Sequence, residues 1–362
     1  MFGIKKSALT VYVFACFLVL SGCSVISETG QRGVKTVFYP PLPNEPRIQL
    51  LTTINAALVQ GKTKNAFSDF VLGKEDGVES RLTKPYGVAY FSNQVIVVDT
   101  RGPGYMILDA NDKVLKTVRG MGPGRMQKPI NVTVDREGRR YISDTGRGQV
   151  MVFDQQDEFL QAYGKLEQFK PSDALVVDGE IYISDLEHHI VHVLDLNSGV
   201  TRRTIGARGS GAGELFFPTN MALMPNNNIL VSDTGNYRLQ EFTLDGRFVR
   251  SYGQAGNGLG QFARPKGIAV DHEGLIYAID SAFENIQLFD RHGQLLMFFG
   301  KPGNELDNIN LPADISISYD GVQSFEQYAD PNFRLQYLVF VTSQYGPNKI
   351  TVYGFGEYRR NL

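Results

Sequence analysis

A proline recurs six times along this chain at a nearly constant spacing, and an aspartate follows five of the six at a nearly fixed distance. The prolines open the segments KPYGVAY, KPINVTV, KPSDALV, FPTNMAL, RPKGIAV and LPADISI, at positions 85, 129, 171, 218, 265 and 312. Successive prolines therefore lie 44, 42, 47, 47 and 47 residues apart. A period of about 40–50 residues with several short strands per unit is typical of propeller blades.

The second landmark of each unit is a residue that ends a short apolar segment and lies nine residues before another apolar position. It is Asp99, Asp144, Asp185, Asp233 or Asp280 in the first five units and Ser343 in the sixth. Period-two alternation and turn sequences such as DREG and LDGR divide each unit into four strands, called a to d here in chain order. The sequence therefore predicts an all-β protein, a six-bladed β-propeller of four-stranded blades.

The sixth unit departs from the others in two ways. Pro312 and Ser343 are 31 residues apart, where the other pairs are separated by 14 or 15, so an insertion over about 319–335 enlarges the a–b connection. The chain also ends at Leu362, too soon for a fourth strand. A strand that precedes the first unit must complete the last blade and remove its exposed edge. Residues 47–54 are the preferred candidate and residues 67–72 the alternative, so the propeller is predicted to span 47–362.

The first 22 residues have the pattern of a signal peptide, with two lysines before an apolar stretch at 8–20. The stretch ends in Leu20-Ser21-Gly22-Cys23, which resembles the lipobox of bacterial lipoproteins. The resemblance implies that Cys23 carries the acyl chains of a lipid anchor; an ordinary signal peptide is the alternative. Ser24, in place of an aspartate, favours the outer membrane with the domain facing the periplasm. Residues 23–46 then form a lipidated, proline-rich linker.

Composition restricts the partners. The chain has 36 Lys and Arg against 38 Asp and Glu, a formal net charge of −2, which gives no support for nucleic-acid binding. Cys16 would leave with the signal peptide, so Cys23 would be the one cysteine of the mature chain and no disulfide could form. We expect a monomer that reaches the membrane through its anchor and binds a cell-envelope protein or glycan.

The segment VSDTGNYRLQEFTLDGRFVRSYGQAGNGLGQFARPKGIAVDHEGLIYAIDS, residues 231–281, resembles the NHL-repeat family of six-bladed propellers. The resemblance extends over about 84–354, and it is weaker in units one, three and six. Together with the lipobox, it makes the chain similar to bacterial six-bladed propeller lipoproteins. NHL propellers elsewhere bind proteins or RNA, and a minority are lyases, so the resemblance alone does not choose a function.

Two recurring features receive structural interpretations. The repeat aspartates are expected to accept hydrogen bonds from backbone N–H groups in the b–c turns. The glycine-rich runs GMGPGR, GARGSGAG and GQAGNGLG each precede a strand, whereas a phosphate loop precedes a helix. We therefore predict that these runs connect strand d of one blade to strand a of the next.

The second residue after each proline is the strongest candidate for metal chemistry. It is glycine at Gly87 and Gly267, and an oxygen-bearing residue in the other units: Asn131, Asp173, Asn220 and Asp314. Strand a lines the channel, so these four side chains are expected to converge at one mouth, where hard cations such as Ca²⁺ find suitable ligands. The pattern resembles gluconolactonase- and paraoxonase-like propellers, although no counterpart of their first-blade glutamate is found near Tyr86. The alternative is that water and loop backbone satisfy these groups, and a bound metal could also be structural.

The b–c loops carry the residues expected to form a binding face, because arginine and aromatic side chains are enriched at interfaces. These are Arg101, Arg147, His188, His189, Tyr237, Arg238, Phe283 and Tyr345, joined on the d–a loops by Arg119, Arg125, Arg208 and Lys301. An alternative is that arginines such as Arg238 pair with neighbouring loops. Among five histidines, His188 and His189 are the candidates for a zinc ligand or a general base.

These observations predict a lipid-anchored binding or assembly module of the cell envelope, with a protein, peptide or glycan as ligand. No cofactor is expected for that function. The alternative is a calcium-dependent hydrolase of lactones or esters that uses Asn131, Asp173, Asn220 and Asp314. Calcium is the cofactor of the alternative only.

Overall fold

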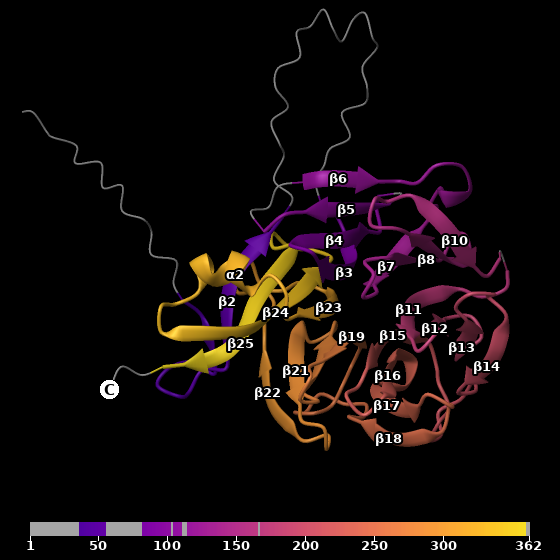
Figure 1. The fold of residues 1–362 in the computed structure, drawn as a ribbon. Coiled ribbons are helices and arrows are strands. Elements are labelled where there is room, and N and C mark those ends of the chain that lie inside the picture. Colours follow the sequence, from indigo (N-terminus) through magenta and orange to yellow (C-terminus); the bar gives the residue numbers. More distant parts are fainter. Residues whose placement is uncertain (1–35, 56–81, 103, 111–113, 166, 360–362) are drawn as a thin grey trace, which may run out of the picture. The chain divides into compact units, whose positions relative to one another are not determined.

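The fold was taken from a computed structural model that describes residues 36–55, 82–102, 104–110, 114–165 and 167–359. Six β-sheets stand around a common axis, with β3, β7, β11, β15, β19 and β23 nearest the centre (Figure 1). The chain is a six-bladed β-propeller, as predicted. Among the described residues, no helix is long and apolar enough to cross a membrane.

Five of the blades are regular four-stranded antiparallel sheets in which each strand pairs with its neighbour in sequence. Blade 1 consists of β3 (Pro85–Phe91), β4 (Gln94–Asp99), β5 (Tyr105–Leu108) and β6 (Val114–Val118). Blade 2 consists of β7 (Pro129–Val134), β8 (Arg140–Asp144), β9 (Gln149–Phe153) and β10 (Phe159–Tyr163). Blade 3 consists of β11 (Pro171–Val177), β12 (Glu180–Asp185), β13 (Ile190–Asp195) and β14 (Thr201–Ile205). Blade 4 consists of β15 (Pro218–Leu223), β16 (Asn228–Asp233), β17 (Arg238–Thr243) and β18 (Phe248–Tyr252). Blade 5 consists of β19 (Pro265–Val270), β20 (Ile276–Asp280), β21 (Asn285–Phe289) and β22 (Leu295–Phe299).

Blade 6 combines the two ends of the propeller. Its order is β1 (Phe38–Tyr39), β2 (Ile48–Ile54), β25 (Ile350–Tyr358), β24 (Phe333–Ser343) and β23 (Pro312–Ser318). Strand β2 pairs antiparallel with β25, with Ile48 opposite Phe355 and Ile54 opposite Ile350. This confirms that residues 47–54 close the ring; the alternative at 67–72 lies outside the described residues. The predicted insertion contains α2 (Val322–Phe325) and η3 (Glu326–Tyr328).

The segment predicted as a linker corrects the expected domain boundary. Phe38 and Tyr39 form β1, which pairs with β2 as a fifth strand of blade 6. The ring of Phe38 lies 5.6 Å from that of Phe333 and 5.4 Å from that of Tyr358. Aromatic side chains inside a proline-rich stretch gain free energy by covering the open edge of the last blade, so the sheet begins before residue 47.

Neighbouring blades pack face to face through apolar side chains. Between blades 1 and 2, for example, Ile96 and Val98 share one buried cluster with Ile142 and Met151. Val95 and Val97, which alternate with Ile96 and Val98 along β4, belong to the cluster on the other face of the blade, so both faces of this strand are buried. The glycine-rich runs connect successive blades as predicted, since each lies between the last strand of one blade and the first of the next.

The repeat aspartates hold the loops at one face of the ring. Asp144 is fully buried, and its carboxylate accepts hydrogen bonds from the backbone N–H groups of Gln127 (2.6 Å), Lys128 (2.9 Å), Gly146 (2.9 Å) and Arg147 (3.0 Å). Two of these donors lie in the b–c turn and two just before strand a, so one carboxylate ties both connections together. The prediction that the repeat aspartates accept hydrogen bonds from the b–c turns is confirmed. The same carboxylate also accepts hydrogen bonds from the d–a loop. In blade 6, Ser343 Oγ accepts the N–H of Asn310 at 3.2 Å and partly replaces the aspartate.

We predict that Asp144→Ala lowers the free energy of unfolding by about 2–4 kcal/mol, because it leaves several buried N–H donors without an acceptor. Urea denaturation of the purified protein measures the change. Asp245→Ala is the control, since Asp245 lies in an exposed c–d turn and its loss should cost less than about 0.5 kcal/mol. Equal effects of the two substitutions would contradict the assigned role.

Candidate functional site

The four predicted oxygen-bearing residues are brought together in the channel. They form two hydrogen-bonded pairs: Asn131 Nδ2 donates to Asp173 Oδ1 at 2.8 Å, and Asn220 Nδ2 donates to Asp314 Oδ1 at 2.9 Å. All four side chains are buried. Gly87 completes this part of the ring without a side chain, because a Cβ there would lie 2.2 Å from Asn131 Oδ1.

The carboxylates of this ring are also bound by the backbone. Asp173 Oδ2 accepts the N–H of Met221 at 2.8 Å, and Asp314 Oδ2 accepts the N–H of Val88 at 3.1 Å. Burial nevertheless raises the pKa of Asp173 to about 7, and burial together with the charge of Asp173 raises the pKa of Asp314 well above its ordinary value. Asn220 Oδ1 is buried without a hydrogen-bond partner among the described residues. These oxygens are of the kind that bind a hard cation, although amide N–H groups already donate hydrogen bonds to the carboxylates.

Two residues that directly precede the glycines of the ring lie on its b–c loop side. They are Tyr86 and Lys266, each the first residue after the proline of its strand. Both side chains are only 7% exposed, and Lys266 Nζ lies 4.7 Å from the centre of the Tyr86 ring in a cation–π contact. In blades 1 and 5, where the second residue after the proline is glycine, the first residue is therefore buried beside the ring, which the spacing alone did not indicate.

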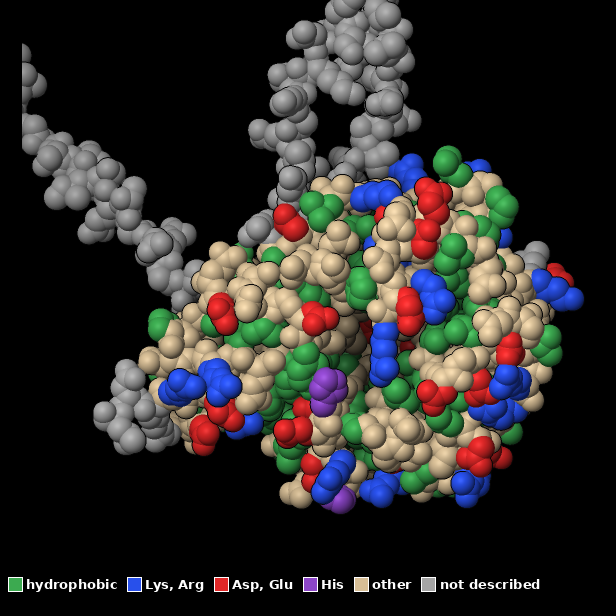
Figure 2. All heavy atoms as spheres, viewed as in Figure 1, with side chains coloured by type: hydrophobic (Ala, Val, Ile, Leu, Met, Phe, Trp, Pro, Cys, Tyr) green, Lys and Arg blue, Asp and Glu red, His purple; other side chains and the backbone are tan. Residues whose placement is uncertain are grey.

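The cavity beneath the ring extends in the opposite direction. It has a volume of about 200 Å³ and is lined by Asn131, Asp173, Asn220 and Asp314 together with residues farther along the inner strands, including Tyr90, Val134 and Ile317. These last residues lie near the ends of their strands, where the a–b connections begin. The face that carries α2 is drawn toward the reader in Figure 1, and Figure 2 shows its surface dipping at the centre of the ring. A ligand of these four residues would have to enter from this face.

The predicted binding residues divide into exposed and structural groups. Arg101 and His188 are exposed, as are Tyr237 and Tyr345, with 45% and 52% of their surface accessible. Phe283 is half-buried.

Arg147 and Arg238 are tied to the protein itself, which is the alternative that the sequence left open. Arg147 donates to the carbonyl of Arg125 at 2.7 Å, and Arg238 Nε donates to Asp233 Oδ2 at 2.9 Å. Both guanidinium groups therefore brace connections between strands.

His189 was predicted on the exposed face, and this prediction is wrong. The residue is 4% exposed and its Nδ1 accepts the N–H of Phe217 at 3.0 Å. Its ring lies 4.7 Å from the Phe216 ring and 4.5 Å from the Phe217 ring. Its left-handed backbone, with φ of 61°, turns the imidazole inward against these two rings.

Tyr237 and Phe283 lie on the loop face, at the edge of one depression. They border a shallow depression of about 420 Å³ between blades 4 and 5, whose remaining lining is Ala255, Gly256, Asn257, Phe262 and Ala263. Tyr237 has a left-handed backbone, with φ of 57°, at the end of the short helix η2 (Thr234–Asn236). Two aromatic side chains from different blades thus border one mostly apolar surface, as at binding hot spots.

Four basic residues lie on the loop face at the start of the inner strands, and the sequence analysis missed them as a group. They directly precede the inner-strand prolines in four blades and are Lys84, Lys128, Lys170 and Arg264. None of the four makes an ion pair with a carboxylate within the part of the chain that the structure describes. The recurring dipeptides KP and RP were the available signal. This part of the loop face is positively charged although the chain as a whole is close to neutral.

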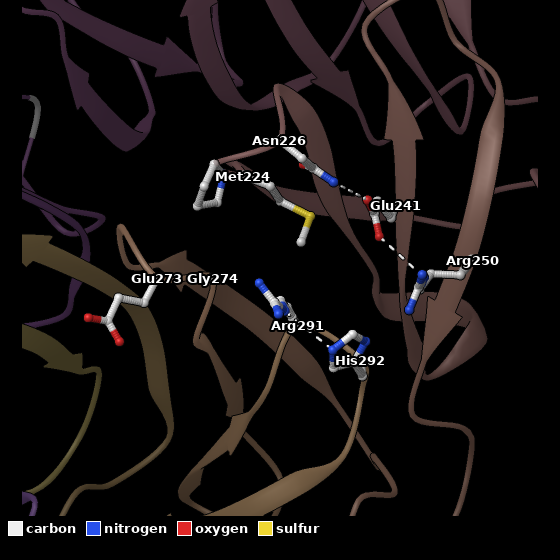
Figure 3. A pocket seen from close by; sticks show the side chains of 9 residues that line it. Met224, Asn226, Glu241, Arg250, Glu273, Gly274, Arg291 and His292 are labelled. Atoms are coloured by element: carbon white, nitrogen blue, oxygen red, sulfur yellow. Dashed lines mark hydrogen bonds and ion pairs between the residues drawn. The ribbon is translucent and has the colours of Figure 1, made fainter.

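Another pocket lies on the other face, between blades 4 and 5 (Figure 3). It has a volume of about 370 Å³ and is lined by Met224, Pro225, Asn226, Glu241, Arg250, Glu273, Gly274, Arg291 and His292. Burial alone would raise the pKa of Glu241, but hydrogen bonds from Asn228, Tyr252 and Asn226 outweigh it and keep the pKa below its ordinary value. Since Glu241 is fully engaged in joining strands, this pocket carries no evident chemistry.

Comparisons with known proteins agree on the architecture. A family model described as a 6-bladed beta-propeller matches residues 220–353. A gluconolactonase from Xanthomonas campestris is 15% identical, with a TM-score of 0.56 over 87% of this chain and 91% of that one. A protein of unknown function from Bacteroides thetaiotaomicron is 16% identical, with a TM-score of 0.57 over 85% and 75% of the two chains. Virginiamycin B lyase from Staphylococcus aureus is 13% identical, with a TM-score of 0.52 over 77% and 85%.

The shared property is the fold. At these identities the neighbours establish six blades and nothing about substrates, because one propeller scaffold hosts unrelated activities. The finer resemblance to NHL repeats stays a prediction.

We predict that Lys266→Met stabilises the protein at pH 7 by about 1–3 kcal/mol. Burial, reinforced by the positive charges of Arg264 and Lys84, lowers the pKa of Lys266 to about 8. Between pH 8 and about 10.5 the unfolded state binds more protons than the folded state, so the wild type regains stability as pH rises and the difference shrinks. Urea denaturation from pH 7 to 10 measures this, with exposed Lys128→Met as the control. If the difference in the free energy of unfolding between Lys266→Met and the wild type stays constant across that range, the lowered pKa of Lys266 is contradicted.

Proposed function

We propose that this protein is a lipid-anchored binding module of the bacterial cell envelope that docks an acidic partner on its loop face. The observation that carries the proposal is the depression bordered by Tyr237 and Phe283 on the loop face. Ala263 lines the depression and Arg264 is the next residue along the chain. A partner would place an apolar side chain between the aromatic rings and a carboxylate near Arg264.

Energetic considerations support recognition at this face. A central aromatic anchor at an interface contributes about 2 kcal/mol or more, whereas basic residues at the rim mainly accelerate association. The burial of Tyr86 and Lys266 favours a macromolecular partner, because these side chains restrict the access of a small ligand to the channel from this side. A protein or peptide fits these features better than a neutral glycan does.

The proposed location rests on the N-terminal sequence. Residues 1–22 would direct export, Cys23 would carry the acyl chains, and the chain up to about residue 35 would separate the propeller from the membrane. Ser24 supports the outer membrane, with the propeller in the periplasm. The propeller would then present its loop face to partners within reach of that tether.

A second candidate function is a calcium-dependent hydrolase, and one observation favours it. Asn220 Oδ1 is an orphaned buried acceptor beside two buried carboxylates, and a divalent cation would satisfy all three. Asn131, Asp173, Asn220 and Asp314 would hold the ion, which would polarise a carbonyl oxygen when bound. Substrate would enter from the α2 face, because Tyr86 and Lys266 restrict access from the other side.

We predict that a photo-reactive phenylalanine analogue at position 237 or 283 cross-links one envelope protein in intact cells. The same analogue at exposed position 160, on the outer strand of blade 2, should give no such product. Arg264→Glu should reduce the yield several-fold, because it reverses a charge at the rim. Mass spectrometry of the product reveals whether the partner segment is acidic.

Two further results bear on the cross-linking experiment. Cys23→Ala should abolish the product while leaving the propeller folded, since the chain would no longer reside at the membrane. Identical products from positions 237 and 160, or a yield that Arg264→Glu leaves unchanged, would overturn the proposed docking face.

For the hydrolase, we predict about one calcium ion per chain by elemental analysis and a melting temperature that calcium raises. The variant Asn131→Ala plus Asp314→Ala should lose both the bound calcium and this rise in melting temperature. A chain dialysed against chelator and resupplied with calcium provides the reference. No bound calcium and no change in melting temperature would eliminate this candidate. Asn226→Ala, in the separate pocket of the same face, controls for non-specific destabilisation.

A further inference from the structure

Blade 3 differs from the other blades in what surrounds its repeat aspartate. Asp185 Oδ2 lies 2.7 Å from His188 Nδ1 and 2.9 Å from His192 Nε2. The three ligand atoms lie within 4.8 Å of one another. Two imidazoles and one carboxylate are a set of ligands that transition metals bind in proteins.

We propose that Asp185, His188 and His192 form a Zn²⁺ site on the loop face, with a fourth coordination position open to solvent. This site is separate from the channel ring and from the proposed docking depression, so it does not depend on the proposed function.

The equivalent position in blade 4 shows what the repeat uses when no metal is involved. Asp233 Oδ2 there accepts hydrogen bonds from Asn236 Nδ2 at 2.8 Å and from Gln240 Nε2 at 3.0 Å. These residues follow Asp233 by three and seven positions, just as His188 and His192 follow Asp185. Blade 3 therefore replaces two amides, which satisfy the carboxylate but bind zinc poorly, with two imidazoles at the same places.

A second difference leaves room for an ion. In blade 4, Arg238 Nε adds a third hydrogen bond to Asp233 Oδ2 at 2.9 Å. The corresponding residue of blade 3, five positions after the aspartate, is Ile190. No guanidinium therefore competes for Asp185 Oδ2 in blade 3.

The surroundings hold the ligands in place. Asp185 Oδ1 accepts the N–H groups of Lys170 (3.0 Å) and Glu187 (2.8 Å), which leaves Oδ2 for the imidazoles. The His192 ring lies 5.2 Å from the ring of Phe169. Such supporting contacts orient ligands and strengthen metal binding.

The exposure of the three residues suits an ion that enters from solvent. The side chain of Asp185 is fully buried, that of His192 is 14% exposed and that of His188 is 49% exposed. Bonds to zinc of about 2.0–2.1 Å place tetrahedral ligands roughly 3.3 Å apart, so the pairs at 2.7 and 2.9 Å must open slightly. His188 has the freedom to do so because half of its side chain is in solvent.

The test uses the purified full chain, stripped with EDTA and titrated with Zn²⁺ and, as a spectroscopic probe, with Co²⁺. The expected result is one ion per chain and the visible absorption bands of four-coordinate cobalt. The informative variant is His188→Asn plus His192→Gln, which installs the residues of blade 4. It should keep the wild-type melting temperature in EDTA and lose the bound ion and the cobalt bands.

His272→Gln plus His292→Gln is the matched control, because it removes two histidines from the opposite face and should bind zinc as the wild type does. His192→Gln alone should weaken zinc binding about tenfold or more, and it replaces the double variant if that variant does not fold. Absence of stoichiometric zinc in the wild type, or equal retention by the blade 4 mimic, would overturn the proposal.

Discussion

Burial of a carboxylate among backbone N–H groups is the interaction on which the loop face depends. In five of the six blades an aspartate ends the second strand. Its carboxylate accepts hydrogen bonds from the turn that follows it and from the segment before the first strand. These connections contain glycine-rich and polar residues that cannot pack a core of their own. Without the carboxylate their N–H groups would be buried and unpaired, so the surface proposed to bind a partner would lose its shape.

The ends of the chain impose the second constraint on the ring. A propeller leaves no open sheet edge only if its last blade is completed, and here β2 pairs with β25 for that purpose. The additional strand β1 covers β2 in turn, with Phe38 and Tyr39 packed on aromatic side chains of blades 5 and 6. The described part of the chain therefore begins at blade 6.

The two faces of the ring offer different chemistry. On the loop face, Tyr86 and Lys266 are buried beside the ring and other basic and aromatic side chains are exposed, which suits a macromolecular partner. On the α2 face, the cavity leads to four oxygen-bearing side chains, which suits a cation. The proposed zinc site adds a third possibility on the outer part of the loop face. Because the three sites share no residue, each can be removed by substitution without altering the others.

The sequence by itself determined the number of blades, the strand order, the closing strand and the structural role of the repeat aspartates. Each of these follows from a pattern that repeats along the chain, such as the proline spacing or the offset after Asp144. It also predicted that Asn131, Asp173, Asn220 and Asp314 meet, because equivalent positions of a ring face one axis. Only the tertiary structure decided that Tyr86 and Lys266 are buried beside them, that His189 is buried and that Tyr237 and Phe283 border one depression. These outcomes depend on how side chains from different blades fill a shared space, and a pattern within one repeat carries no information about its neighbour's side chains.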